Sequence, residues 1–111
     1  MELSNQVIDV NSIAAAHPRG YFNTLLASAN DHVIRLSIMT EPFDWHYHPN
    51  SDETFIGMEG IVVIETETGI VELGPGQLYT VPRNVRHSSR PKDGRSVNLT
   101  FEHKNMETVK G

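Results

Sequence analysis

Residues 45–60 read WHYHPNSDETFIGMEG and place two histidines and a glutamate around a short turn. His46 and His48 are two positions apart, so in a strand their side chains share one face, about 7 Å apart along the backbone. Residues 49–51 favour a turn that would bring Glu53, on the next strand, back beside both histidines. The segment therefore predicts a hairpin that offers three ligands to one metal ion.

A fourth candidate ligand, His87, follows the turn at residues 82–84 and begins another predicted strand. It can complete the site only if the barrel brings that strand opposite the hairpin, which sequence spacing alone does not decide. Three imidazoles and a carboxylate suit borderline divalent ions such as iron, manganese, nickel, zinc or copper, with one or two positions left for water or substrate. We predict one divalent metal ion, of undetermined identity, held by His46, His48, Glu53 and His87.

Short apolar segments separated by turn residues make up most of the chain, and no long segment has helical period. This pattern is typical of an all-β sandwich or barrel. Strands are predicted at Asn23–Ser28, His32–Thr40, Asp44–His48, Glu53–Met58, Ile61–Glu67, Ile70–Leu73, Gln77–Val81, Val85–Arg90 and Ser96–Glu102. Before them, a short strand is predicted at Gln6–Val10 and a helical turn near Ser12–Ala16.

A chain of 111 residues fits a single domain. We divide it into an N-terminal segment (1–22) that packs on the barrel or on a dimer partner, the barrel itself (23–103) and a polar tail (104–111) that is expected to fray.

Composition narrows the partners and the chemistry. The net charge of −5 and the lack of a basic run argue against nucleic acid and anionic membrane as partners. The absence of cysteine excludes disulfides, thiolate catalysis and sulfur-based zinc sites. No signal peptide or membrane span is recognisable, so a cytoplasmic protein that acts on a small molecule is expected.

Two segments of the sequence resemble the two motifs of the cupin superfamily, in the family's order, and together cover about half of the chain. The first motif, HxH, four residues, Glu, six residues, Gly, is matched at His46, His48, Glu53 and Gly60. The second, Gly, five residues, Pro, one residue, a turn residue, two residues, His, is matched at Gly76, Pro82, Asn84 and His87. Asn84 replaces the usual Gly, a mild change because Asn also accepts left-handed geometry, and Pro91 stands where the motif ends in Asn.

The resemblance implies a single-domain double-stranded β-helix, or jelly-roll barrel, with a metal inside it and frequent homodimers. By alternation, Phe55 and Gly57 share the face of Glu53, and Ser89 shares that of His87. These three residues and Tyr79 are the predicted pocket lining. The remaining histidines, at positions 17, 32 and 103, are expected to be solvated and are left out of the site.

Two functions remain open from the sequence. The favoured one is a metal-dependent enzyme, of isomerase, lyase or dioxygenase type, acting on a small sugar-like or keto/hydroxy-acid substrate within the barrel. The alternative is a module that binds a small molecule or stores the metal without catalysis, because fold alone does not decide function.

Overall fold

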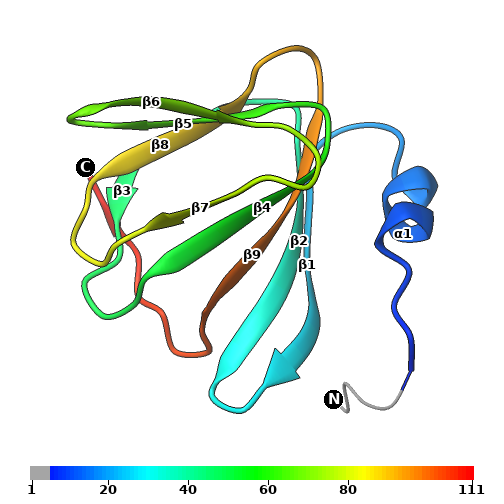
Figure 1. The fold of residues 1–111 in the computed structure, drawn as a ribbon, viewed down its shortest axis with the longest axis horizontal. Coiled ribbons are helices and arrows are strands. Elements are labelled where there is room, and N and C mark those ends of the chain that lie inside the picture. Colours follow the sequence, from blue (N-terminus) through cyan, green and yellow to red (C-terminus); the bar gives the residue numbers. More distant parts are fainter. Residues whose placement is uncertain (1–5) are drawn as a thin grey trace.

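Two antiparallel five-stranded sheets face each other in the computed structural model, which describes residues 6–111 (Figure 1). One sheet has the order β1-β2-β9-β4-β7 and the other β10-β3-β8-β5-β6. The strands are β1 (Phe22–Ala29), β2 (His32–Met39), β3 (Phe43–Tyr47), β4 (Glu53–Glu59), β5 (Val62–Thr66), β6 (Gly69–Leu73), β7 (Leu78–Val81), β8 (His87–Pro91), β9 (Ser96–His103) and β10 (Val109–Lys110). The predicted all-β double-stranded β-helix is confirmed, and the nine predicted strands correspond to β1 to β9.

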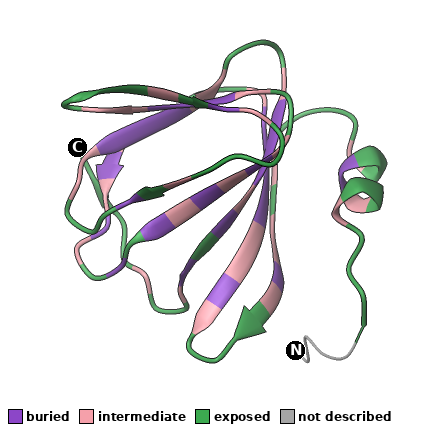
Figure 2. Cartoon of the chain, viewed as in Figure 1, coloured by how far each residue is buried: buried purple, intermediate pink, exposed green. Residues whose placement is uncertain are grey.

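Apolar side chains form two clusters, on opposite sides of the first sheet. The cluster inside the barrel contains Met39, Phe55, Val62, Ile64, Leu73 and Val81. The cluster outside contains Ala14, Leu26, Leu36, Ile38 and Val97. Because side chains alternate along a strand, β2 sends Met39 to the inner cluster and Ile38 to the outer one. Buried positions therefore recur along the strands that border the interior (Figure 2).

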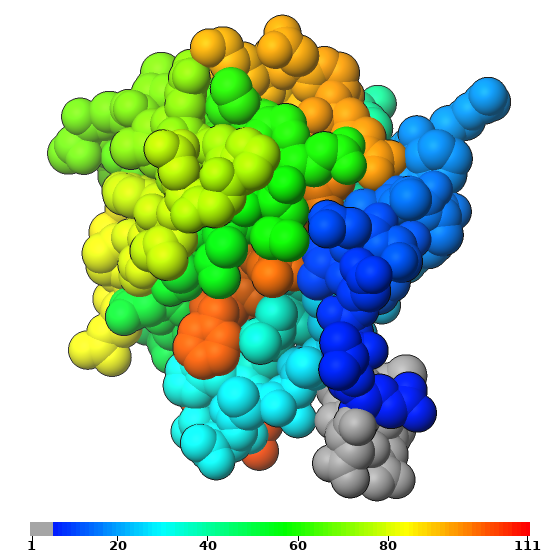
Figure 3. Space-filling model, turned by 45° about the vertical axis from the view of Figure 1, so that its right-hand side comes forward, coloured from blue at the N-terminus to red at the C-terminus, as the bar shows by residue number. Residues whose placement is uncertain are grey.

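A short helix, α1 (Val10–Ala16), covers the outer cluster and contributes the buried Ala14. Asp9 begins it as N-cap, because its side chain accepts a hydrogen bond from the backbone N–H of Ser12 at 3.2 Å. The predicted helical turn is thus confirmed. The predicted strand at Gln6–Val10 is wrong, because Asp9 is the N-cap of α1 and Val10 is its first residue. Figure 3 shows this N-terminal segment, in blue, lying along one side of the barrel. Within the described residues, no helix has the length and apolar character that crossing a membrane requires.

The C-terminal segment is ordered against the barrel, so the prediction of a frayed tail is wrong. In β10, Val109 pairs with Tyr47 and Lys110 with His46 on β3. The backbone N–H of Gly111 also donates to the Trp45 carbonyl at 2.9 Å. The segment covers backbone groups of β3 that would otherwise form a sheet edge, which polar composition alone does not reveal.

Two backbone positions fix turns and close approaches near the site. Asn84 has φ of 69°, so it adopts the left-handed geometry expected of it in the turn before β8. Gly57 lies so close to the Gly74 carbonyl that a Cβ atom would collide with this backbone oxygen. The close approach holds β4 against the turn before β7, and only glycine permits it.

We predict that Gly57→Ala lowers the free energy of unfolding by about 1–3 kcal/mol, because neither backbone segment can move without disturbing the sheet. Gly69→Ala is the matched control, since a Cβ atom there meets nothing within 4 Å, and it should change the value by less than about 1 kcal/mol. Urea unfolding followed by circular dichroism measures both. Equal stability of the two variants would contradict the packing argument.

Candidate metal centre and barrel cavity

The four predicted ligands converge inside the barrel. Their ligand atoms all lie within 4.8 Å of one another. All four side chains are buried, with exposed fractions of 5% for His46, 4% for His48, 8% for Glu53 and 0% for His87. The structure therefore brings together residues from three segments of the chain as a group that could hold a metal ion.

The route by which they meet differs from the predicted hairpin. β3 and β4 belong to different sheets, so the turn at residues 49–51 is a crossing connection and Glu53 reaches the centre from the facing sheet. His87 is directly opposite His46 in the pairing of β8 with β3. His48 lies just beyond the end of β3. The predicted hairpin is wrong, because the same turn residues serve a hairpin and a crossover equally well.

Each imidazole is oriented through its Nδ1 atom by a backbone carbonyl. Nδ1 lies 2.7 Å from the Asp44 carbonyl in His46, 2.9 Å from the Val85 carbonyl in His87 and 2.9 Å from the Glu107 carbonyl in His48. A carbonyl oxygen only accepts, so Nδ1 must carry the proton and donate it. This leaves the Nε2 lone pairs available for a metal, as in well-ordered metal-binding histidines.

The charge of the centre also fits a cation. The Glu53 Oε1 atom lies 3.1 Å from Nε2 of His48 and 3.3 Å from Nε2 of His87. Burial alone would raise the pKa of Glu53, but the contacts with these two imidazoles lower it to about 2, so the group is a carboxylate. Because each Nδ1 already carries a proton, an Nε2 atom beside a carboxylate must bind a second proton or share a metal ion with it.

The two imidazoles of the HxH pair differ in basicity. Burial lowers the pKa of His46. Burial opposes protonation of His48 as well, but the Glu53 carboxylate outweighs it and raises the pKa of that imidazole. His48 is therefore the imidazole of the pair that takes up a proton first as the pH falls.

The centre opens on a cavity of about 250 Å³ inside the barrel. Its lining residues are Tyr21, Asn23, Arg35, Ser37, Met39, Phe43, His46, His48, Glu53, Phe55, Ser89, Asn98, Thr100, Glu102, Met106 and Thr108. Two of the four predicted lining residues, Phe55 and Ser89, are among them. The other two lie elsewhere: Gly57 contacts the backbone of Gly74, and Tyr79 packs on the inner apolar cluster.

A polar row on β9 is the part of the cavity that sequence analysis missed. Asn98, Thr100 and Glu102 alternate with apolar residues along the strand and are buried with exposed fractions of 0%, 6% and 6%. Burial raises the pKa of Glu102, and the nearby charge of Glu53 adds to the effect. The alternation of polar and apolar residues along β9 is visible in the sequence, but the polar face of a strand is ordinarily assigned to the solvent side.

The C-terminal segment also belongs to the site. Its Met106 and Thr108 line the cavity. The Thr108 hydroxyl lies 3.2 Å from Nδ1 of His48, beside the Glu107 carbonyl. Asn50 holds this segment from the barrel side, since its amide donates to the Asn105 carbonyl at 3.0 Å and accepts from the Glu107 N–H at 2.9 Å.

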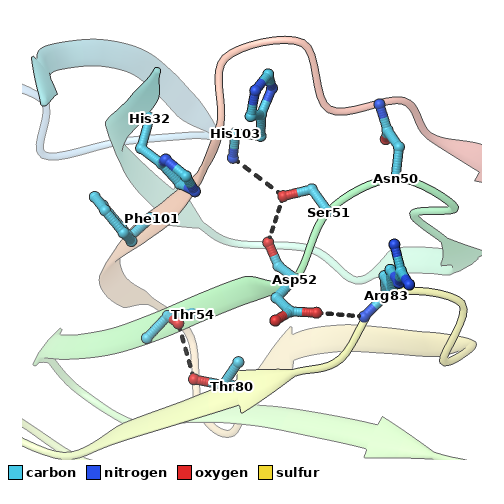
Figure 4. A pocket seen from close by; sticks show the side chains of 9 residues that line it. All are labelled: His32, Asn50, Ser51, Asp52, Thr54, Thr80, Arg83, Phe101 and His103. Atoms are coloured by element: carbon cyan, nitrogen blue, oxygen red, sulfur yellow. Dashed lines mark hydrogen bonds between the residues drawn. The ribbon is translucent and has the colours of Figure 1, made fainter. Parts of the chain in front are cut away.

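A second cavity, of about 410 Å³, lies among His32, Asn50, Ser51, Asp52, Thr54, Thr80, Arg83, Phe101 and His103 (Figure 4). Its polar side chains largely bond one another or nearby backbone. Thr54 and Thr80 share a hydrogen bond of 2.8 Å, and Asp52 accepts from the Arg83 N–H at 2.8 Å. None of the predicted metal ligands lines this outer cavity.

Comparison with known proteins identifies the family. The family model described as Cupin domain matches residues 38–99. Over 111 aligned positions, which span 97% of this chain and 92% of the relative, the chain is 35% identical to the uncharacterized protein YdbB of Bacillus subtilis (strain 168). A cupin-2 domain containing protein from Shewanella frigidimarina superposes with a TM-score of 0.81 and 28% identity, covering 88% of this chain and 95% of that chain. The chain belongs to the cupin family.

The chain is also similar to longer proteins. It is 33% identical over 84 residues to acireductone dioxygenase of Bacillus subtilis (strain 168), a match that covers 71% of this chain and 47% of the dioxygenase. The similarity thus spans about half the length of that relative.

We predict that His46→Ala weakens metal binding by about 100-fold or more, because it removes one of four ligands, while the barrel still folds on its apolar clusters. Elemental analysis of the purified variant, with circular dichroism as a check of folding, measures this. His32→Ala, a histidine outside the cluster, is the control and should keep the wild-type metal content. A full complement of metal in the first variant would count against the site.

Metal retention should fall as the solution is acidified. Protons compete for the Nε2 lone pairs, and His48, whose pKa is raised, takes up a proton before His46, whose pKa is lowered, whereas Glu53 stays ionised. Below the pKa of His48 we expect apparent affinity to drop about tenfold per pH unit for each proton bound. Dialysis against metal at pH values between about 8 and 5, followed by elemental analysis, tests this. Constant occupancy across that range would be inconsistent with imidazole ligands.

Asn50→Ala should weaken metal binding by about tenfold, because it frees the segment whose Glu107 carbonyl orients His48. Asn105→Ala is a matched control, since Asn50 contacts only the backbone carbonyl of that residue and the substitution leaves it in place. Calorimetric titration with zinc compares the two variants. Equal affinities would show that the tail does not position His48.

Proposed function

We propose that the protein is a metal-dependent enzyme that acts on a small sugar-like or keto/hydroxy-acid substrate inside the barrel, by isomerase, lyase or dioxygenase chemistry. The observation that carries the proposal is the convergence of three imidazoles, each with Nδ1–H held by a carbonyl, with the carboxylate of Glu53 at the wall of a cavity. A structural metal site is closed by its protein ligands, whereas a site bordering a cavity keeps positions for a substrate.

The residues around the metal centre have different roles in the proposed reaction. When bound, a divalent ion supplies Lewis acidity, and a redox-active ion such as iron also supports oxygen chemistry. The apolar side chains of Met39 and Phe55 exclude water from one part of the cavity. Glu102 adds a second carboxyl group to the lining, which is the type of group that acid–base catalysis uses.

The similarity to acireductone dioxygenase supports an oxygenase as one of the three chemistries. The match covers about half of that protein, so the dioxygenase's substrate and reaction are extended to this chain only as part of the proposal. The metal ligands, the cytoplasmic location and the homodimer stay predictions, as does the choice among iron, manganese, nickel, zinc and copper.

The proposal is tested by turnover with and without metal. Protein purified with its metal is incubated with sugar phosphates, hydroxy acids that include sugar acids, keto acids and catechols, before and after removal of the metal by a chelator. We expect turnover of at least one class, a loss of about 100-fold or more on chelation, and recovery on adding metal back. His46→Ala should remain inactive after the same addition.

A non-catalytic role would give a different result. If no compound turns over with any of the five metals, but compounds raise the melting temperature of the loaded protein, the chain is a binding module and the proposal fails. Turnover that persists in both the chelated protein and His46→Ala would also refute it.

A further inference from the structure

Two side chains of β9 that line the cavity each have a buried oxygen atom without a hydrogen-bond partner. Among the described residues, the buried side-chain atoms without a hydrogen-bond partner are Ser96 Oγ, Asn98 Oδ1 and Glu102 Oε1. Of these three residues, Asn98 and Glu102 line the barrel cavity beside the proposed metal centre. A buried polar atom without a partner destabilises the folded chain, so native proteins rarely keep one without a reason. A ligand that donates hydrogen bonds to the Asn98 and Glu102 oxygens would remove this destabilisation.

The orientation of the Asn98 amide is fixed by its neighbour. Its Nδ2 atom lies 3.3 Å from the Leu99 carbonyl oxygen, to which only the NH₂ group can donate. The amide oxygen is therefore the atom left for the ligand, and it can only accept. This requirement favours a ligand with hydroxyl groups.

Arg35 adds positive charge to the same lining. Its Nε atom lies 3.6 Å from Glu102 Oε2, longer than a hydrogen bond, so this contact leaves guanidinium donors for a ligand. With a divalent ion in place, the formal charges of the ion, Arg35, Glu53 and Glu102 leave one net positive charge. The cavity therefore suits a ligand with one negative charge.

Size limits the ligand further. The cavity volume of about 250 Å³ lies below the roughly 300–1,000 Å³ of pockets that hold drug-sized molecules. The outer cavity is larger, but neither Asn98 nor Glu102 belongs to its lining. The barrel cavity is therefore the one whose lining residues match a small polar ligand.

We propose that Asn98, Glu102 and Arg35 form a subsite that recognises a small hydroxylated monocarboxylate, with its hydroxyl groups donating to Asn98 Oδ1 and Glu102 Oε1 and its carboxylate facing Arg35. The inference rests on the proposed function, since it assigns the substrate class of the same cavity. It selects polyhydroxylated acids over sugar phosphates, catechols and simple keto acids.

Calorimetric titration of the zinc-loaded protein with three compounds tests the subsite. D-gluconate has the carboxylate and the hydroxyl groups, hexanoate has only the carboxylate, and D-glucitol has only the hydroxyl groups. We expect D-gluconate to bind at least about tenfold more tightly than either, because only it satisfies both kinds of contact. Equal binding of hexanoate, or of D-glucitol, would overturn the proposal.

Two variants locate the contact. Asn98→Leu keeps a similar shape without the amide and should weaken D-gluconate binding by about fivefold, and Glu102→Leu by about tenfold or more, because hydrogen bonds to charged groups are stronger. The melting temperature of ligand-free Asn98→Leu should change little, since the substitution removes the unpartnered oxygen together with the long hydrogen bond from Nδ2 to the Leu99 carbonyl. Thr54→Val, on the outer cavity, is the control and should bind as the wild type does. Unchanged binding in both leucine variants would refute the subsite.

The outcomes separate this inference from the proposed function. Wild-type protein that binds no metal refutes the metal centre itself. Protein that binds metal and turns over another compound, but does not prefer D-gluconate, refutes only the subsite.

Discussion

The hydrogen bond from each imidazole Nδ1 to a backbone carbonyl is the constraint on which the site depends. His46 and His87 use the carbonyl two residues earlier in their own segments, so the local chain that supplies each ligand also sets its tautomer. His48 has no such local partner and uses the Glu107 carbonyl, which is 59 positions away in sequence. Two orientations are thus determined locally, whereas the third is determined by tertiary folding.

The C-terminal segment, which supplies the Glu107 carbonyl, is held against the barrel despite its polar composition. It pairs with β3, is held by Asn50, and contributes Met106 and Thr108 to the cavity wall.

The interior of the barrel is divided into an apolar part and a polar part. Apolar side chains fill one part of the barrel, and the polar row of β9 faces the other part with atoms left unpaired. Stability and ligand recognition therefore use different parts of the same interior.

Much of the fold could be predicted from the sequence because turn residues and period-two alternation are local signals. The ligand types were equally visible, since His46, His48, Glu53 and His87 lie in spaced motifs. The crossing of the chain between sheets was not, because a turn does not specify which strands will pair. Alternation also does not say which face of β9 is inside, and the sequence does not fix the strand register that directs Tyr79, which packs on the apolar cluster.

The position of α1 has a mechanical consequence for the cavity. On β9, Val97 packs in the outer cluster with Ala14 of the helix, and the adjacent Asn98 lines the cavity on the opposite face. A single layer of backbone therefore separates the N-terminal helix from the cavity floor. Arg95 anchors this arrangement by donating to the Ala14 and His17 carbonyls at the end of the helix. The helix thus supports from outside the strand whose inner face forms the cavity floor.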